Sequence, residues 1–143
     1  MTRITPSAPA ITRGVCRLFD AMGCGTLTEF SIANGRRFDV FALHADGRLT
    51  GVEVKSCVRD FRSDRKWRDY LDHCDAFFFA VSENFPVDLL PADCGVLVAD
   101  TYAATILRDA PRLVLHAARR KALTLRFALT ASIRLRCHED AEV

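Results

Sequence analysis

The chain has 143 residues, of which 50% are hydrophobic and 27% are charged, with a formal net charge of +2. These values predict one soluble globular domain over residues 1–143, long enough to bury a core without a disulfide or a structural metal. So small a net charge does not by itself indicate nucleic-acid binding, which only an uneven distribution of the charge would favour.

The first half of the chain predicts a loose arm, a helix and three strands. Residues 1–9 contain two prolines and few apolar anchors, so we expect them to be flexible. Apolar residues at helical spacing from 15 to 22 predict an amphipathic helix that ends near 23–25. Two loops of the type Ala-Asn-Gly and Ala-Asp-Gly are strong hairpin signals and predict an antiparallel meander. Its three strands would be TLTEFSI, RRFDVFAL and LTGVEVKS.

The second half predicts a crossover to a buried parallel strand. Ser63 is expected to cap a short helix over 64–73, which leads into the continuous apolar run 76–82. Two more strands are expected over 94–100 and 103–109, and a last long helix should begin at 109–111. The expected core stripe of that helix is Leu115, Ala118, Ala122, Leu125 and Leu129, and the acidic end, 138–143, should be flexible. The fold class is therefore α/β or α+β, a mixed sheet with packed helices.

The cysteines and the apolar runs bear on the compartment. None of the 6 cysteines forms a Cys-x-x-Cys pair, so free thiols in a reducing environment are expected. The N-terminal segment lacks the apolar centre of a signal peptide, and the longest apolar run, 76–81, is too short to cross a bilayer. We expect a cytoplasmic protein without a membrane partner.

Loop length decides which side chains meet across the meander. Three-residue loops closed by a left-handed glycine place Glu29 opposite Asp39, and Asp39 opposite Glu53, in one row on one face of the sheet. Lys55 and Arg37 then lie in the next row. Two-residue turns are equally allowed and would break the row, although an acid facing the core would make such a turn costly in the second loop. The opposite face would carry Phe30, Phe38, Val40, Val52 and Val54.

Three neighbouring carboxylates predict a cation site. Like charges opposite one another destabilise a sheet, and a bound divalent cation would remove that penalty. Oxygen ligands without His or Cys favour Mg²⁺ or Mn²⁺ over zinc. The alternative is a solvated sheet face with a cross-strand ion pair.

The ordered motifs resemble a nuclease superfamily. Asp39, then Glu53-Val54-Lys55 on the next strand, then a helix and a buried parallel strand, are similar to the PD-(D/E)XK nucleases, with Phe38 where their motif has proline. The segments EFSIANGRRFDVFAL, GVEVKS, DFRSDRKWRDY and FPVDLLPADCGVLVAD resemble the MmcB-like family of bacterial DNA-repair proteins, over residues 12–136. The resemblance implies a PD-(D/E)XK nuclease-like core and a Mg²⁺- or Mn²⁺-dependent deoxyribonuclease. The alternative is a DNA-binding or scaffolding subunit that has lost turnover.

The resemblance also implies residue roles. Asp39 and Glu53 would be the catalytic metal ligands, the Val54 carbonyl a backbone ligand, and Lys55 the residue that orients or activates the attacking water. Glu29 would be a further ligand if its side chain lies on the site face. Two residues spaced i, i+4 on the crossover helix, Lys66 and Tyr70, would support the site, with a surface pair as the alternative.

Basic side chains in two regions predict contacts with DNA. Three arginines of the last helix recur every seven positions, which indicates a phosphate-tracking ridge or, as the alternative, a solvated face. The others lie near the carboxylates. The expected partner is DNA, whether branched, damaged or single-stranded, together with a second copy or a repair protein because the basic excess is small. The proposed DNA-binding residues are Arg37, Arg59, Arg62, Arg112, Arg119 and Arg126.

Overall fold

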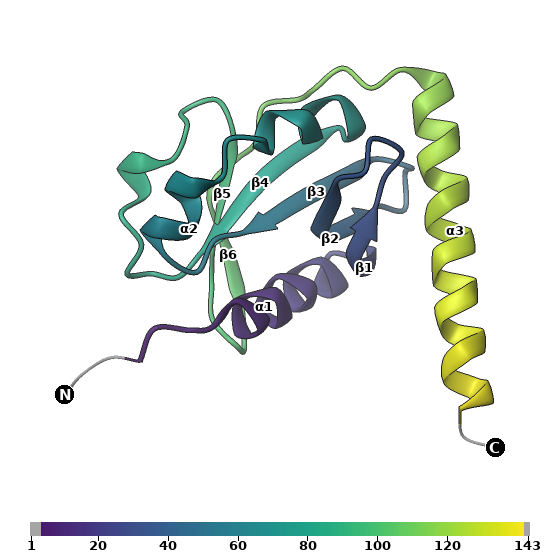
Figure 1. Cartoon of the computed structure of the whole chain (residues 1–143), viewed down its shortest axis with the longest axis horizontal. Helices are drawn as coiled ribbons and strands as arrows, with labels where there is room; N and C mark the ends of the chain where they lie inside the picture. The colour runs from purple at the N-terminus through teal and green to yellow at the C-terminus, as the bar shows by residue number, and fades with distance from the viewer. Residues whose placement is uncertain (1–3, 142–143) are drawn as a thin grey trace.

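A computed structural model describes residues 4–141 and shows one mixed sheet with helices on both faces (Figure 1). The six strands lie side by side in chain order. Neighbours are antiparallel except for β3–β4 and β4–β5, which are parallel. The fold class is therefore as expected. The elements are α1 (Ala8–Ala21), β1 (Gly25–Ser31), β2 (Arg37–Leu43), β3 (Leu49–Val54), α2 (Val58–Ser63), the 3₁₀ helix η1 (Trp67–His73), β4 (Ala76–Val81), the 3₁₀ helix η2 (Val87–Leu89), β5 (Gly95–Ala99), β6 (Ala104–Arg108) and α3 (Ala117–Asp140).

Each face of the sheet has its own core. On one face, α1 packs its apolar side against β2, β3, β4 and β5, with Ile11 and Val15 fully buried. On the other face, α2, η1 and the start of α3 cover an aromatic cluster. A helix with one apolar face must bury it against another element, and a sheet covered on both faces gains two such layers.

The register of the meander is as expected from three-residue loops. Ile32 N–H donates to the Arg36 carbonyl and His44 N–H to the Arg48 carbonyl, both at 2.9 Å. Gly35 and Gly47 have positive φ angles of 83° and 92°, the left-handed conformation that closes each loop.

The single apolar face expected for the meander is wrong, because its members divide between the two cores. Phe30 and Phe38 join the aromatic cluster, whereas Val40, Val52 and Val54 pack against the α1 face. In β1 the alternation is interrupted beside Glu29, whose φ of 49° is left-handed. In β2, Phe38 and Val40 are two residues apart yet face different cores, so the alternation is also interrupted at Asp39. A sheet with two buried faces accepts an aromatic residue on either side.

The crossover differs from the single capped helix expected over 64–73. Ser63 ends α2 instead of capping a helix, and its hydroxyl donates to the Asp60 carbonyl at 2.9 Å. A short turn then leads into the 3₁₀ helix η1. Alternating charges in this segment leave few apolar residues to hold a longer helix against the sheet, and Trp67 and Tyr70 provide the buried contacts of η1.

The last helix starts later than expected and buries a different face. Residues 109–116 are extended, and α3 begins at Ala117. Leu123 and Phe127 are its buried residues, while Leu125 and Leu129 of the expected core stripe are exposed. The first turn of α3 is held by a residue outside the helix, because Arg120 donates two 2.6 Å hydrogen bonds to the Asp75 carboxylate.

The ends of the chain are only partly described. Ala8 and Pro9 belong to α1, and residues 138–140 belong to α3; residues 1–3 and 142–143 of the stretches expected to be flexible lie outside the described residues. Between residues 4 and 141, no helix combines the length and the apolar character needed to span a bilayer.

Candidate functional site

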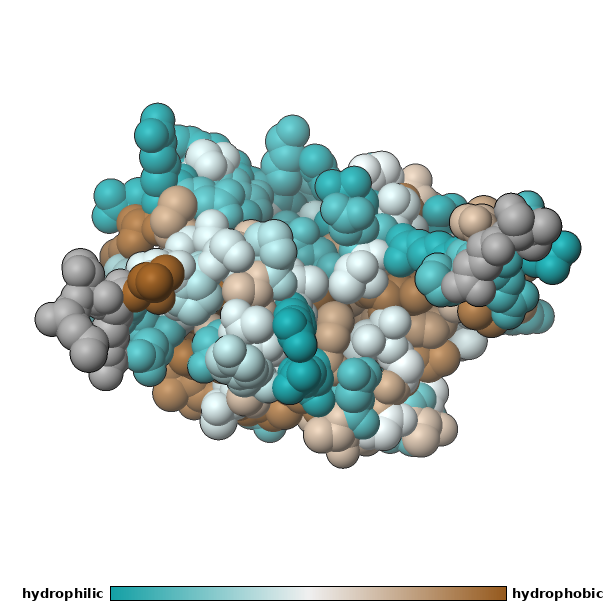
Figure 2. All heavy atoms as spheres, turned by 90° about the horizontal axis from the view of Figure 1, so that it is seen from below, coloured by the Kyte–Doolittle hydropathy of each residue, from teal (hydrophilic) through white to brown (hydrophobic). Residues whose placement is uncertain are grey.

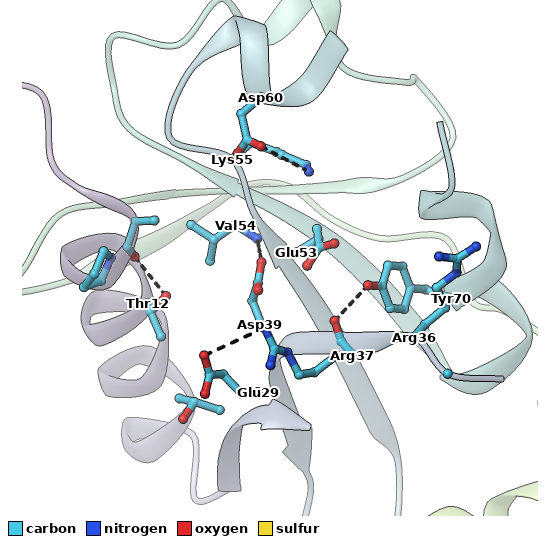
Figure 3. Close-up of a pocket in the computed structure, with 14 residues that line it drawn as sticks. Thr12, Glu29, Arg36, Arg37, Asp39, Glu53, Val54, Lys55, Asp60 and Tyr70 are labelled. Carbon is cyan, nitrogen blue, oxygen red and sulfur yellow. Dashed lines mark hydrogen bonds and ion pairs between the residues drawn. The ribbon is translucent and has the colours of Figure 1, made fainter. Parts of the chain in front are cut away.

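A cleft of about 710 Å³ opens where β2 and β3 separate. Asp39, Glu53, Lys55 and Tyr70 line it, and the N-terminal end of α1 forms one wall with Ala8, Pro9 and Thr12. Figure 3 shows the carboxylates of Asp39 and Glu53 on adjacent strands, between Tyr70 and α1. The cleft therefore gathers the predicted catalytic residues from the separate segments 39 and 53–55.

Strands β2 and β3 separate at Asp39 because its side chain takes the place of a backbone acceptor between them. The β2–β3 ladder ends at the pair Val40–Val52, and beyond it the Val54 N–H donates to Asp39 Oδ2 at 2.7 Å. The next residue, Lys55, donates its N–H to the Ala80 carbonyl, towards β4. Since backbone groups alternate in direction along a strand, the Val54 carbonyl faces the Asp39 side.

Asp39 and Glu53 form a close carboxyl pair. The Glu53 residue is only 8% exposed. Burial, the hydrogen bond to Asp39 and the negative charge of Asp39 together raise the pKa of Glu53 to about 9. Without a cation, burial and the neighbouring Asp39 therefore favour the protonated, uncharged form of Glu53, whose pKa is raised.

Lys55 is buried and remains a cation. Its Nζ lies 2.8 Å from Asp64 Oδ2 and 3.9 Å from Asp60 Oδ1, and its side chain is 7% exposed. Burial acts to lower the pKa of Lys55, but the hydrogen bond and charge of Asp64, with the charges of Glu53 and Asp60, outweigh burial and raise it. Lys55 is thus suited to stabilise negative charge and poorly suited to accept a proton.

The two predicted supporting residues have different surroundings. Tyr70 is buried in η1 beside Glu53, and its hydroxyl donates to the Arg37 carbonyl at 2.8 Å. Burial and the neighbouring Glu53 charge raise the pKa of the Tyr70 phenol, so the hydroxyl stays protonated. Lys66 is exposed at the start of η1 and does not line the cleft. Only Tyr70 of this pair therefore contributes to the site.

Glu29 lines the cleft, but its carboxylate does not join the pair. It lies 4.0 Å from Arg37, and its side chain is 70% exposed. Arg134 of α3 donates to the carbonyls of Thr28 and Glu29 at 2.6 Å and 2.9 Å, on both sides of the left-handed residue. Two converging carboxylates take the place of the expected three, and within residues 4–141 no group of three or more His, Cys, Asp or Glu side chains is arranged to hold a metal.

The predicted DNA-binding arginines are dispersed over the surface. Arg37 lines the cleft, whereas Arg59 and Arg62 are exposed on α2. Arg112 lies in the extended segment before α3. The other two donate to main-chain carbonyls of the body, Arg119 to Asp72 at 3.0 Å and Arg126 to Ser31 at 3.4 Å. Of the three arginines expected to form a ridge at a spacing of seven residues, only Arg119 and Arg126 lie on α3, and both also attach the helix to the domain.

Several contacts escaped sequence reasoning. From the sequence, no role is assigned to Asp60 and Asp64, although their spacing of four residues soon after Lys55 is a usable signal. No sequence signal indicated the pairing of Asp75 with Arg120, which are 45 residues apart. Long-range ion pairs depend on how elements pack, so local patterns do not reveal them.

The donor set fits a hard divalent cation. Mg²⁺ keeps several waters and is commonly held by one or two carboxylates together with substrate phosphates. Asp39, Glu53 and the Val54 carbonyl provide oxygen donors of this kind beside an open cleft. The raised pKa of Glu53 marks a buried carboxyl whose charged form a bound cation would stabilise.

Comparisons with known proteins agree with these observations. The family model "DNA repair protein MmcB-like" matches residues 2–142. The chain belongs to the MmcB-like family. A solved structure, the SPO1766 protein of unknown function from Silicibacter pomeroyi, superposes with a TM-score of 0.91 and 42% sequence identity over 99% of this chain and 96% of that chain. No curated protein matches the chain. Membership of the MmcB-like family associates the fold with DNA repair.

Proposed function

We propose that this MmcB-like protein is a Mg²⁺- or Mn²⁺-dependent nuclease that hydrolyses phosphodiester bonds of DNA during repair. The observation that carries the proposal is the pair of half-buried Asp39 and buried Glu53 in an open cleft beside the Lys55 ammonium group. Folding alone does not favour two adjacent carboxyls, one of them with a pKa near 9, whereas divalent-cation binding does. The DNA-repair description of the family provides the substrate class.

In this mechanism each residue has a separate task. Asp39, Glu53 and the Val54 carbonyl would hold the ion, and a bound ion would supply a water of lowered pKa and positive charge beside the scissile phosphate. Lys55 stays protonated and stabilises the negative charge that develops on the phosphate. Tyr70 restrains Glu53 and the Arg37 backbone on one side of the cleft.

A second candidate function is DNA binding without turnover, as in a scaffolding subunit of a repair complex. The observation that favours it is the Lys55 ion pair, because an ammonium already 2.8 Å from Asp64 has a competing anionic partner. The two candidates make different predictions for catalysis and the same prediction for DNA affinity, so they can be separated by experiment.

The test is a cleavage assay on purified protein with single-stranded, nicked and branched DNA in Mg²⁺, Mn²⁺ or EDTA. The nuclease proposal expects cleavage that EDTA abolishes and that Glu53→Gln or Lys55→Met lowers by on the order of 10² or more. DNA affinity should change little, because neither variant removes a major share of the phosphate contacts.

The matched control is Asp46→Asn, which removes an exposed carboxylate far from the cleft, in the β2–β3 loop. It should cleave at the wild-type rate. Tight DNA binding with no cleavage of any substrate in Mn²⁺, by wild type and variants alike, would refute the nuclease and leave the binding subunit.

A further inference from the structure

The long helix α3 has two opposite faces in different surroundings. Leu123 and Phe127 are buried against the aromatic core. Consecutive residues of a helix are about 100° apart, so Leu125 and Leu129 lie on the side opposite Phe127. They are 57% and 63% exposed. Figure 1 shows α3 along one edge of the molecule, with its outer side turned away from the sheet.

The outer side carries a continuous apolar stripe. Ala118, Ala122, Leu125, Leu129 and Ile133 follow one another at steps of three or four residues, and all five are exposed. Four of them were expected from the sequence to be core. Seen from below, the surface at this end of the molecule mixes hydrophilic and hydrophobic side chains (Figure 2). A stripe of this length on a helix that already has a buried face is typical of a protein interface.

We propose that this outer stripe is the contact of a two-fold dimer, in which α3 packs antiparallel against α3 of a second copy. A two-fold interface must be self-complementary. When Leu129 faces its own counterpart across the axis, Leu125 faces Ile133 of the other copy, and Ala122 faces the aliphatic stem of Arg136. Large side chains then fill the centre, and a small residue receives a long one on each flank.

The charges of α3 favour the same arrangement. Its first turns are basic, with Arg119 and Lys121, and its last turn is acidic, with Glu139 and Asp140. In the register centred on Leu129, the acidic end of each copy lies beside the basic start of the other. Lys121 then approaches Glu139, and Arg119, which also donates to the Asp72 carbonyl of its own copy, approaches Asp140. All four residues are exposed.

A parallel pairing would lose this complementarity. It would place each residue at the height of its own counterpart, so Arg126 would meet Arg126 and Arg136 would meet Arg136. The acidic ends would also lie together. Like charges across an interface are unfavourable, and the antiparallel arrangement avoids both the arginine–arginine contacts and the contact between the acidic ends.

The experiment measures the mass of the full chain by sedimentation equilibrium over a range of concentrations. Wild type should dimerise, and Leu129→Asp should weaken the dimer by on the order of 100-fold, because it places a charge at the centre of the contact. The matched control is Leu135→Asp. Leu135 is 58% exposed on the same helix but lies off the stripe, so this variant should dimerise as wild type does. Circular dichroism checks that both variants remain folded.

A charge exchange tests the direction of the helices. Lys121→Glu should weaken the dimer by about fivefold, and Lys121→Glu with Glu139→Lys should restore it. A wild-type chain that stays monomeric at every concentration overturns the proposal, as does equal dissociation by Leu129→Asp and Leu135→Asp. Failure of the double exchange to restore the affinity overturns the antiparallel arrangement.

Discussion

The carboxyl pair makes the stability of the metal-free protein fall as the pH rises above 7. Burial and the neighbouring Asp39 raise the pKa of Glu53 to about 9 in the folded state, from the ordinary value of 4.5. Between these values the folded protein keeps a proton that the unfolded chain has released. The stabilising contribution is therefore complete below the unfolded value and is lost as the pH rises towards 9. Glu53→Gln should remove this dependence, since the amide resembles the protonated carboxyl in shape and carries no charge.

The size of the effect follows from the width of the pH window. Each unit of pH within the window changes the free energy of unfolding by about 1.4 kcal/mol per proton. From pH 7 to pH 8.5, wild type should lose about 2 kcal/mol more than Glu53→Gln. Burial lowers the pKa values of His44 and His73 from 6.5, so their titration lies outside the compared range of pH 7 to 8.5.

Urea unfolding in EDTA at the two pH values provides the measurement. Glu29→Gln is the matched control, because it removes a carboxylate of the same cleft that is 70% exposed; it should follow wild type. Adding Mn²⁺ should stabilise wild type more at pH 8.5 than at pH 7, since the cation displaces the proton, and should leave Glu53→Gln unchanged. Parallel pH profiles of wild type and Glu53→Gln in EDTA would refute the reasoning.

Three further predictions concern contacts around the site. Tyr70→Phe removes the 2.8 Å hydrogen bond to the Arg37 carbonyl and should lower the free energy of unfolding by about 1 kcal/mol, measured by urea titration; an unchanged value would mean that water replaces the hydroxyl. Asp75→Ala leaves the Leu49 N–H and the Arg120 guanidinium without their shared acceptor, so the free energy of unfolding should fall by about 3 kcal/mol. The melting temperature should therefore be lower than that of wild type, and an unchanged value would contradict the anchoring of α3. Lys55→Met should be less destabilising in an Asp64→Asn background than in wild type, because the single variant leaves a half-buried carboxylate unpaired; additive melting temperatures would show that the pair is not coupled.

Turn chemistry in the sequence predicted the register of Asp39 and Glu53 on the condition that each loop has three residues. The Ala-Asn-Gly and Ala-Asp-Gly loops each end in a glycine that adopts the left-handed conformation, and this fixes which residues face each other across the hairpins. Asp39 and Glu53 therefore come together as predicted. The apolar run of β4 likewise revealed a strand buried on both faces and a parallel crossover.

Other local patterns were ambiguous because only packing decides them. The stripe from Ala118 to Leu129 is apolar, and from the sequence it was interpreted as core, yet the helix turns Leu123 and Phe127 to the sheet instead. Apolar side chains at helical spacing mark a face that avoids water, but they do not say whether the chain itself or another molecule covers that face. The Asp75–Arg120 contact and the late start of α3 decide which face is turned inward.

The sequence indicated the strands and, for loops of three residues, the meeting of Asp39 with Glu53, because turn geometry acts over a few residues. Only the tertiary structure decided that Glu29 turns away towards Arg37, that Lys55 is held by Asp64, and that the helical arginines attach α3 to the body. These outcomes depend on side chains from distant segments competing for the same partners. Such competition is settled only when the helices have packed on the sheet, which is why no local pattern of the sequence contains it.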